Sequence, residues 1–311
     1  MKKYAKEKKE KKEKKEKKEK KEKKEKKENG KMKILATNDV HQMTSKWKGL
    51  VKACKEEKPE VVAVAGDLFP KDTYITGQMP FMKHFKKYIN QINETGAKVV
   101  LTLGNDDNQN LIPEFEKCHE DGLFYYVSES VCEIDGYEFA GMPFVPDYPF
   151  GYKFWCHGEF KDNLRICETQ FTDPVLVNKD NKFEIIPDYK EYLLNKKSIW
   201  ESLVETASCV KNIKKSIWLI HAPPSGIDLD VCCHGAKVGS DAVLKFIEEY
   251  QPLVCIHGHI HESPEYNGHK WCQQEGNTLC VQGGQIGFTL HYSILDFKDG
   301  KIIKKEHSRY E

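Results

Sequence analysis

Short apolar, strand-like runs in this chain repeatedly end at a residue type that binds metals. In sheets that are covered by helices, ligands bind outside the carboxyl ends of the strands. Metal-binding residues that follow several strands would therefore meet at one edge of the sheet. Aspartate, asparagine and histidine together suit divalent Mn, Fe, Ni, Co or Zn. The pattern thus predicts a metal site built from five stretches: Thr37-Asn38-Asp39-Val40-His41, Gly66-Asp67, Gly104-Asn105-Asp106-Asp107, His221-Ala222-Pro223-Pro224 and Gly258-His259-Ile260-His261.

The first half of the chain beyond residue 31 alternates between strand and helix patterns. This alternation predicts a parallel α/β core, with strands at 33–38, 61–65 and 98–103 and helices at 45–58, 77–94 and 112–119. From residue 123 the pattern changes. Three short runs predict the start of an antiparallel portion, with a hairpin turn at Asp135-Gly136; they are 123–127, 131–134 and 137–141.

Residues 143–190 contain many Pro, Asp, Asn and aromatic residues without periodicity. We interpret them as a long excursion, a kind of segment that often forms a lid. Beyond it the sequence predicts helices at 189–212 and 239–250, each before an apolar run, and a hairpin turn at Asp299-Gly300. The remaining strands are predicted at 217–220, 253–256, 279–282, 290–297 and 301–305.

The first 31 residues form a segment unlike the rest, with 18 Lys and 8 Glu. Glutamate recurs at every third position from Glu7 to Glu28 with no apolar residue between, so we expect a solvated coil or frayed helix. Its lysines would give at most a weak electrostatic contact with RNA or an anionic surface. Because the whole chain carries +1 and this segment +10, residues 32–311 carry −9, which argues against a general nucleic-acid binder.

The remaining composition bounds the class of protein. Residues 32–311 are expected to form one large globular domain, with two domains as the alternative. Eleven cysteines without a CxxC pair or a signal peptide predict reduced thiols, a cytoplasmic location and no structural zinc site. No apolar run is long enough to span a membrane. Arg165 and Arg309 are the only arginines, so metal ions would provide most of any phosphate recognition.

Two neighbouring divalent ions supply what hydrolysis of a phosphate ester requires, an activated water and neutralisation of the phosphoryl oxygens. A carboxylate must bridge ions about 3.5 to 4 Å apart, and Asp67, after a glycine that permits a tight turn, is the candidate. If the strands continued in extended conformation, Asp39 and His41 would share one face, and so would His259 and His261.

The motifs DxH, GD, GNxD, HxPP and GHxH, in this order, resemble those of the calcineurin-like metallophosphoesterases. The resemblance covers most of residues 32–297, and the sequence after His221 is similar to a small prokaryote-type branch. It implies a four-layer α/β/β/α sandwich of two mixed sheets. It also implies two metal ions, manganese being the first expectation: one bound by Asp39, His41, Asp67 and His261, the other by Asp67, Asn105, His221 and His259.

The resemblance is incomplete at Asp106, where many family members have a histidine that assists the leaving group or steadies the phosphate. An ionised carboxylate would repel a dianionic monoester, so Asp106 must be protonated, turned away or directed at a metal. We therefore expect a phosphoesterase that prefers small diesters to monoesters, with Asp67, Asn105, Asp106 and His221 as catalytic residues. The alternative is a catalytically weak metal-binding scaffold for a protein partner.

Other residues near these motifs are expected to have structural roles. We expect His257 to support a ligand from behind or to pack in the core, with metal binding as the alternative. Asp107 is expected to support a ligand from behind or to cap the next helix. Ordinary loop packing is expected for Cys232, Cys233 and His234, with pocket lining as the alternative. Ordinary surface structure is expected for three residues of the excursion, with substrate contact as the alternative: Trp155, His157 and Arg165.

Overall fold

The computed structural model of the chain describes residues 30–41, 44–70 and 78–310. The Lys/Glu segment, apart from its last two residues, lies outside the described residues. None of the helices in the described ranges is long and apolar enough to cross a bilayer.

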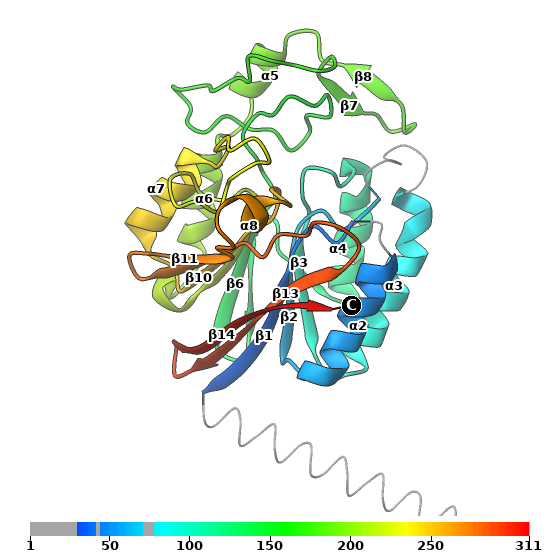
Figure 1. The fold of residues 1–311 in the computed structure, drawn as a ribbon. Coiled ribbons are helices and arrows are strands. Elements are labelled where there is room, and N and C mark those ends of the chain that lie inside the picture. The colour runs from blue at the N-terminus through cyan, green and yellow to red at the C-terminus, as the bar shows by residue number, and fades with distance from the viewer. Residues whose placement is uncertain (1–29, 42–43, 71–77, 311) are drawn as a thin grey trace, which may run out of the picture.

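The body of the molecule contains two six-stranded mixed sheets (Figure 1). In the first sheet β1 to β4 are parallel to one another, β13 is antiparallel to β1, and β14 is antiparallel to β13. The strand order is β14 (Lys301–Tyr310), β13 (Leu290–Lys298), β1 (Lys31–Thr37), β2 (Val61–Ala65), β3 (Lys98–Thr102) and β4 (Tyr125–Tyr126). In the second, the four inner strands are parallel and the edges antiparallel, in the order β11 (Cys272–Glu275), β12 (Thr278–Val281), β10 (Val254–Ile256), β9 (Ile217–Ile220), β6 (Tyr137–Met142) and β5 (Ser130–Ile134).

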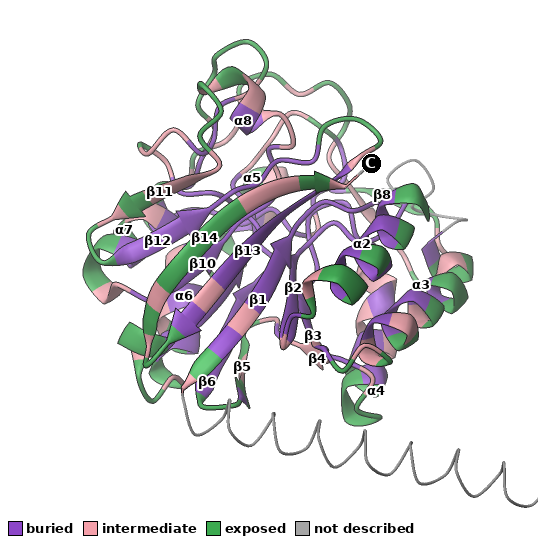
Figure 2. Ribbon diagram, turned by 60° about the horizontal axis from the view of Figure 1, so that its bottom comes forward, coloured by how far each residue is buried: buried purple, intermediate pink, exposed green. Residues whose placement is uncertain are grey.

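Alternate residues of the strands face two different hydrophobic clusters, as the period of two in a strand requires. In β2, Val61, Ala63 and Ala65 belong to the cluster between the sheets, whereas Val62 and Val64 belong to the cluster that includes helix residues. Helices α2, α3 and α4 cover one sheet, and α6 and α7 the other (Figure 1), with exposed outer faces (Figure 2). The predicted four-layer sandwich is thereby confirmed. These helices are α2 (Thr44–Glu57), α3 (Gln78–Asn93), α4 (Ile112–Glu120), α6 (Ile199–Ser208) and α7 (Asp241–Tyr250).

The prediction of an antiparallel portion starting at residue 123 was wrong at its first strand. That segment contributes only Tyr125 and Tyr126, and β4 pairs in parallel with β3 in the first sheet. The antiparallel pairing begins one strand later, in the β5–β6 hairpin, where Asp135 and Gly136 have φ of 50° and 87°. Such left-handed values are those of the central residues of a type I′ turn.

The single helix predicted over 189–212 is instead two helices, α5 (Tyr189–Leu194) and α6. The break has a local cause, because Ser198 caps α6: its hydroxyl accepts from the backbone N–H of Glu201, whose carboxylate accepts from the N–H of Ser198. This reciprocal pair is a capping box. The prediction from periodicity alone missed this break between α5 and α6. It also missed four short elements: η2 (Gln109–Leu111), η3 (Ile213–Lys215), α8 (Ser263–Tyr266) and β11.

The excursion contains a two-stranded hairpin, β7 (Val175–Val177) and β8 (Phe183–Ile185), and with α5 it lies beyond the strand ends (Figure 1). The expectation of surface structure at Trp155 and His157 was wrong, because both are buried. Trp155 donates its indole N–H to the carbonyl of Asp107 at 2.6 Å, and His157 Nδ1 lies 2.7 Å from the carbonyl oxygen of Lys197. These contacts fasten the excursion to the body.

Candidate metal centre

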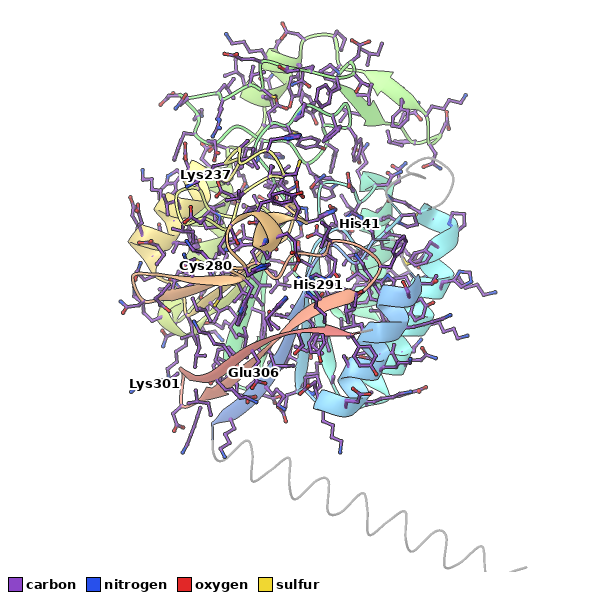
Figure 3. All side chains as sticks on the ribbon, in the orientation of Figure 1. His41, Lys237, Cys280, His291, Lys301 and Glu306 are labelled. Atoms are coloured by element: carbon purple, nitrogen blue, oxygen red, sulfur yellow. The ribbon has the colours of Figure 1, made fainter. Side chains whose placement is uncertain are left out.

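The predicted ligands come from five loops that follow β1, β2, β3, β9 and β10. His41, labelled in Figure 3, shows their position beyond the strand ends and below the excursion. Most of these side chains are buried, and His261 is the most accessible. The parallel strands therefore deliver donor groups from distant parts of the sequence to a single location, as they do in other open α/β sheets.

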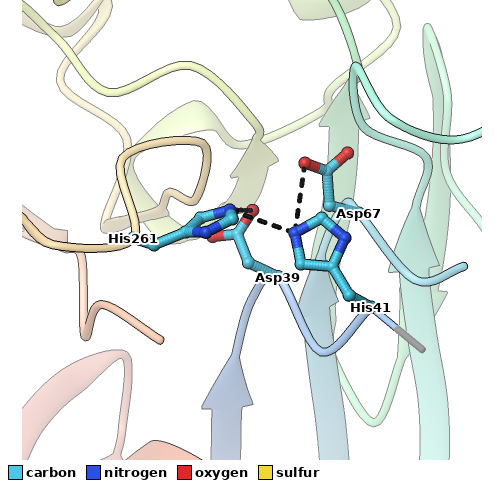
Figure 4. Close-up of side chains that lie close together, drawn as sticks. All are labelled: Asp39, His41, Asp67 and His261. Carbon is cyan, nitrogen blue, oxygen red and sulfur yellow. Dashed lines mark hydrogen bonds and ion pairs between the residues drawn. The ribbon is translucent and has the colours of Figure 1, made fainter. Parts of the chain in front are cut away.

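One group of donors comprises Asp39, His41, Asp67 and His261, whose ligand atoms all lie within 4.8 Å of one another (Figure 4). His261 Nε2 lies 3.0 Å from His41 Nε2 and 3.4 Å from Asp39 Oδ1. His41 Nε2 is also 3.8 Å from Asp67 Oδ2. Two imidazole nitrogens and two carboxylates that converge in this way form a site of the size and chemistry that a divalent cation requires.

The second group of donors adjoins the first through Asp67. His221 Nε2 lies 3.4 Å from Asp67 Oδ2 and 2.8 Å from Asn105 Oδ1. Asn105 Oδ1 is in turn 2.5 Å from His259 Nδ1. All seven residues proposed from the sequence thus lie together, and Asp67 is the member that touches both groups.

The loops achieve this by a backbone conformation that differs from the one expected. Asp39, His41, Asp67 and His259 have φ of 47°, 45°, 52° and 69°, in the left-handed region that costs non-glycine residues free energy. The prediction that the chain continues in extended conformation through Asp39 and His41, and through His259 and His261, was therefore wrong. His259 reaches Asn105 while His261 reaches Asp39 and His41, so the two histidines serve different groups. Strain of this kind concentrates at functional sites.

Gly104 lies where no side chain fits. A Cβ atom there would come within 2.6 Å of His221 Cε1 and closer still to Asp67 Oδ1. A glycine is thus required at this position because Asp67 and His221, two predicted metal ligands, approach its backbone closely.

The proton positions at His221 show that the site fits a cation. Its Nδ1 is 2.8 Å from the carbonyl oxygen of Ala65, which can only accept, so Nδ1 carries the proton. In the neutral ring Nε2 then presents a lone pair to the oxygens of Asn105 and Asp67, an arrangement of acceptors that a metal ion would satisfy. These residues therefore fit the metal ions that the sequence predicts.

The electrostatics of the protein groups alone show how strongly the site favours positive charge. Although burial opposes the charge, the Asp67 carboxylate raises the pKa of His221 to about 10. Burial likewise opposes the charge of Asp39, yet the His261 and His221 rings hold the pKa of that carboxyl well below its usual range. The buried carboxylates thus favour positive charge in this site. Without a metal a protonated His221 supplies it, and a bound cation would take its place with the ring neutral.

A family model supports the assignment that this geometry suggests: the calcineurin-like phosphoesterase model matches residues 32–263. The chain belongs to the calcineurin-like phosphoesterase family. Members of this family typically bind two divalent metal ions.

Solved structures are similar to this chain. The protein TT1561 of Thermus thermophilus is 16% identical, with a TM-score of 0.56 over 90% of this chain and 99% of the other. An archaeal phosphodiesterase is 13% identical (TM-score 0.41, covering 89% and 99%). A dimetal phosphatase from Danio rerio is 10% identical (TM-score 0.46, covering 90% and 99%). No curated protein matches the sequence.

The two aspartates of the GNDD motif, Asp106 and Asp107, have different contacts. Asp106 accepts from Asn105 Nδ2 at 3.1 Å, and its backbone N–H donates to Asp67 Oδ1 at 2.8 Å. Its carboxylate thus turns the amide of Asn105 so that Oδ1 faces the imidazoles. Asp107 lies behind the ligands, where it accepts from the backbone N–H groups of Leu68, Phe69 and Gly104.

Beyond the donor groups the protein has a cleft of about 1640 Å³ that extends under the excursion. Asp67, Asn105, Asp106, His259 and His261 lie in its lining. The expectation of ordinary loop packing was wrong for three residues that line this cleft, Cys232, Cys233 and His234. The exposed side chain of Arg165 also lines it. His257 remains apart from the cleft lining; it is buried, with Nδ1 3.0 Å from the carbonyl oxygens of Ile220 and Ala222.

Proposed function

We propose that the protein is a dinuclear metal-dependent phosphoesterase that hydrolyses phosphodiesters in preference to monoesters. The observation that carries this proposal is the convergence of two donor groups that share Asp67, at the floor of a cleft large enough for a small phosphate ester.

Each protein group has a defined part in this proposal. Asp39, His41, Asp67 and His261 would hold one ion, and Asp67, Asn105, His221 and His259 the other. Bound ions would acidify water and neutralise the phosphoryl oxygens; manganese is our first choice among Mn, Fe, Ni, Co and Zn. The Asp67 carboxylate fixes the separation of the groups, the Ala65 carbonyl fixes the tautomer of His221, and Asp106 orients the Asn105 amide.

The preference for a diester follows from the charges that line the cleft. Asp106, Glu168, Asp173 and Glu262 bring carboxylates to the lining, whereas among the described lining residues Arg165 is the sole arginine and there is no lysine. A phosphomonoester carries up to one negative charge more than a diester at neutral pH. These carboxylates therefore repel the monoester more strongly than the diester.

The test uses the full chain, stripped of metal and reloaded with Mn. We expect metal-dependent hydrolysis of bis-p-nitrophenyl phosphate, slower hydrolysis of p-nitrophenyl phosphate, and loss of both in His221→Ala. His269→Ala changes an exposed histidine and should retain full activity. Faster cleavage of the monoester would overturn the diester preference. Absence of turnover with all five metals would favour the alternative, a metal-binding scaffold for a protein partner.

We also propose a cytoplasmic location and a weak contact of the N-terminal segment with RNA or an anionic surface. All eleven cysteines are free thiols, which suits a reducing compartment. Deletion of residues 1–31 should weaken binding to a generic RNA in a salt-dependent way. Equal affinity with and without the segment would refute this contact.

A further inference from the structure

Several exposed apolar side chains of the excursion gather in the cleft. Phe150, Phe171, Phe183 and Ile185 are 56%, 65%, 49% and 65% exposed, and all four line the cleft that contains the donor groups. Such exposed apolar surface is unfavourable in water, and where it gathers into a patch it marks a binding surface.

Aromatic rings form a continuous path from a predicted metal ligand to the outer part of this patch. The ring of Tyr148 lies 5.9 Å from that of His259, and the ring of Phe150 lies 6.1 Å from that of Tyr148. Phe171 continues the path with an edge-to-face contact to Phe150 at 5.6 Å. We call Tyr148, Phe150 and Phe171 the aromatic wall. It begins beside the position at which phosphate would bind and leads away from it.

Buried polar contacts hold the aromatic wall in place. Lys153, whose side chain is fully buried, donates to Asp147 Oδ1 at 2.7 Å and to the carbonyl of Tyr148. Backbone hydrogen bonds tie the two wall segments together, from Phe171 N–H to the Pro149 carbonyl at 2.8 Å and from Val175 N–H to the Gly151 carbonyl at 2.7 Å. A surface fixed in advance loses less entropy when it binds a ligand.

The charges around the aromatic wall indicate what the ligand carries. With Arg165 as the sole arginine and no lysine among the described lining residues, the cleft has little to bind a second phosphate. Glu168 and Asp173 place hydrogen-bond acceptors in the same lining, and the amino and imino groups of nucleobases are donors. An acyl chain has no use for these acceptors, whereas a base can stack on the rings and donate to them.

We propose that the aromatic wall binds the nucleobase of a nucleoside phosphodiester with a single phosphate, an inference that rests on the function proposed above. The base stacks on Phe150 and Phe171, and the phosphate lies at the donor groups beside His259. Phe150 and Phe171 are accordingly specificity-determining residues rather than catalytic ones.

The test compares three p-nitrophenyl phosphodiesters that share a leaving group and differ in the second alcohol: thymidine, octanol and methanol. With the full-length, Mn-loaded protein, kcat/KM for the thymidine ester should exceed that for the methyl ester by about ten-fold. The double variant Phe150→Leu/Phe171→Leu keeps apolar surface but loses the rings, so it should lose most of this ratio and keep its rate on the methyl ester. Phe288→Leu, which changes a phenylalanine 79% exposed outside the cleft lining, should leave the ratio unchanged.

Two results would overturn the inference. If the octyl ester gains as much as the thymidine ester, and the leucine variant retains that gain, the wall binds acyl chains. If the variant slows all three esters equally, the rings only shape the excursion.

Calorimetry with thymidine itself, which has no phosphate ester to cleave, makes the same comparison without turnover. The Kd should rise about ten-fold in the leucine variant, and equal affinities would refute the base site. A Kd difference without hydrolysis of any ester would remove the proposed function and keep the base site. Metal-dependent hydrolysis with no advantage for the thymidine ester would keep the proposed function and remove the base site.

Discussion

Asp106 is the residue whose charge bears most directly on the proposed preference for diesters. It is buried at the cleft, where its carboxylate contacts Asn105. Asp106→Asn removes this charge but keeps an oxygen that can accept from Asn105, so the ratio of monoester to diester kcat/KM should rise about ten-fold. Glu262→Gln, at another carboxylate of the cleft lining, should change the ratio less. Equal ratios in wild type and Asp106→Asn would contradict the electrostatic explanation of the diester preference.

His157 should make the stability of the fold depend on pH. Burial, with a contribution from Lys196, lowers the pKa of His157 to about 3, against about 6.5 in an unfolded chain. As the pH falls below about 6.5, the unfolded state takes up a proton that the folded state does not, so stability falls. Between pH 7 and pH 5 this group should remove about 2 kcal/mol of the free energy of unfolding.

Urea unfolding of wild type and His157→Gln at both pH values measures this contribution. The variant should lose about 2 kcal/mol less between pH 7 and pH 5 than wild type. Parallel losses in the two proteins would show that His157 is accessible to protons in the folded state.

At the scale of the elements, Asp107 joins the loop after β2 to the loop after β3. Its carboxylate accepts from three backbone N–H groups, those of Leu68, Phe69 and Gly104. Asp107→Ala leaves these buried donors without an acceptor, at about 1 to 3 kcal/mol each. We expect a loss of at least about 3 kcal/mol in urea unfolding and a smaller loss for Asp107→Asn, which keeps one oxygen. A loss below about 1 kcal/mol for Asp107→Ala would contradict this role.

The buried ion pair of Lys153 with Asp147 stabilises the fold of the excursion. Lys153→Met leaves the carboxylate of Asp147 buried without its cation, which is strongly destabilising. Limited proteolysis should therefore cut residues 143–190 faster than in wild type while the two sheets remain intact. Lys182→Met, at an exposed lysine of the same segment, is the matched control. Equal rates of cleavage in all three proteins would show that the buried pair does not hold the excursion.

The strand ends were predictable from sequence because each apolar run stops at a distinct motif. The run before Gly66-Asp67 is β2 with the predicted bounds, and all five motifs meet at one edge. The backbone of the site was not predictable, since the left-handed φ of Asp39 and His41 arises from the packing of loops that are distant in sequence. The contact of Trp155 with the Asp107 carbonyl joins residues 48 apart along the chain, and no local pattern marks it.

For the whole molecule, the two sheets form a rigid support that brings seven donors to one place, and the excursion adds the wall of the cleft. The family model matches residues 32–263, and within this range residues 143–190 contain no pattern from which a substrate could be identified. We therefore expect the fold to supply the chemistry and the excursion to supply its specificity.

The most direct test of this account is the number of metal ions that each chain binds. The full-length protein, stripped and then equilibrated with Mn, should contain two ions per chain by mass spectrometry of the metal, and Asp67→Ala should retain less than one because it removes the shared carboxylate. Fewer than one ion per wild-type chain, or two ions retained by Asp67→Ala, would contradict the dinuclear centre.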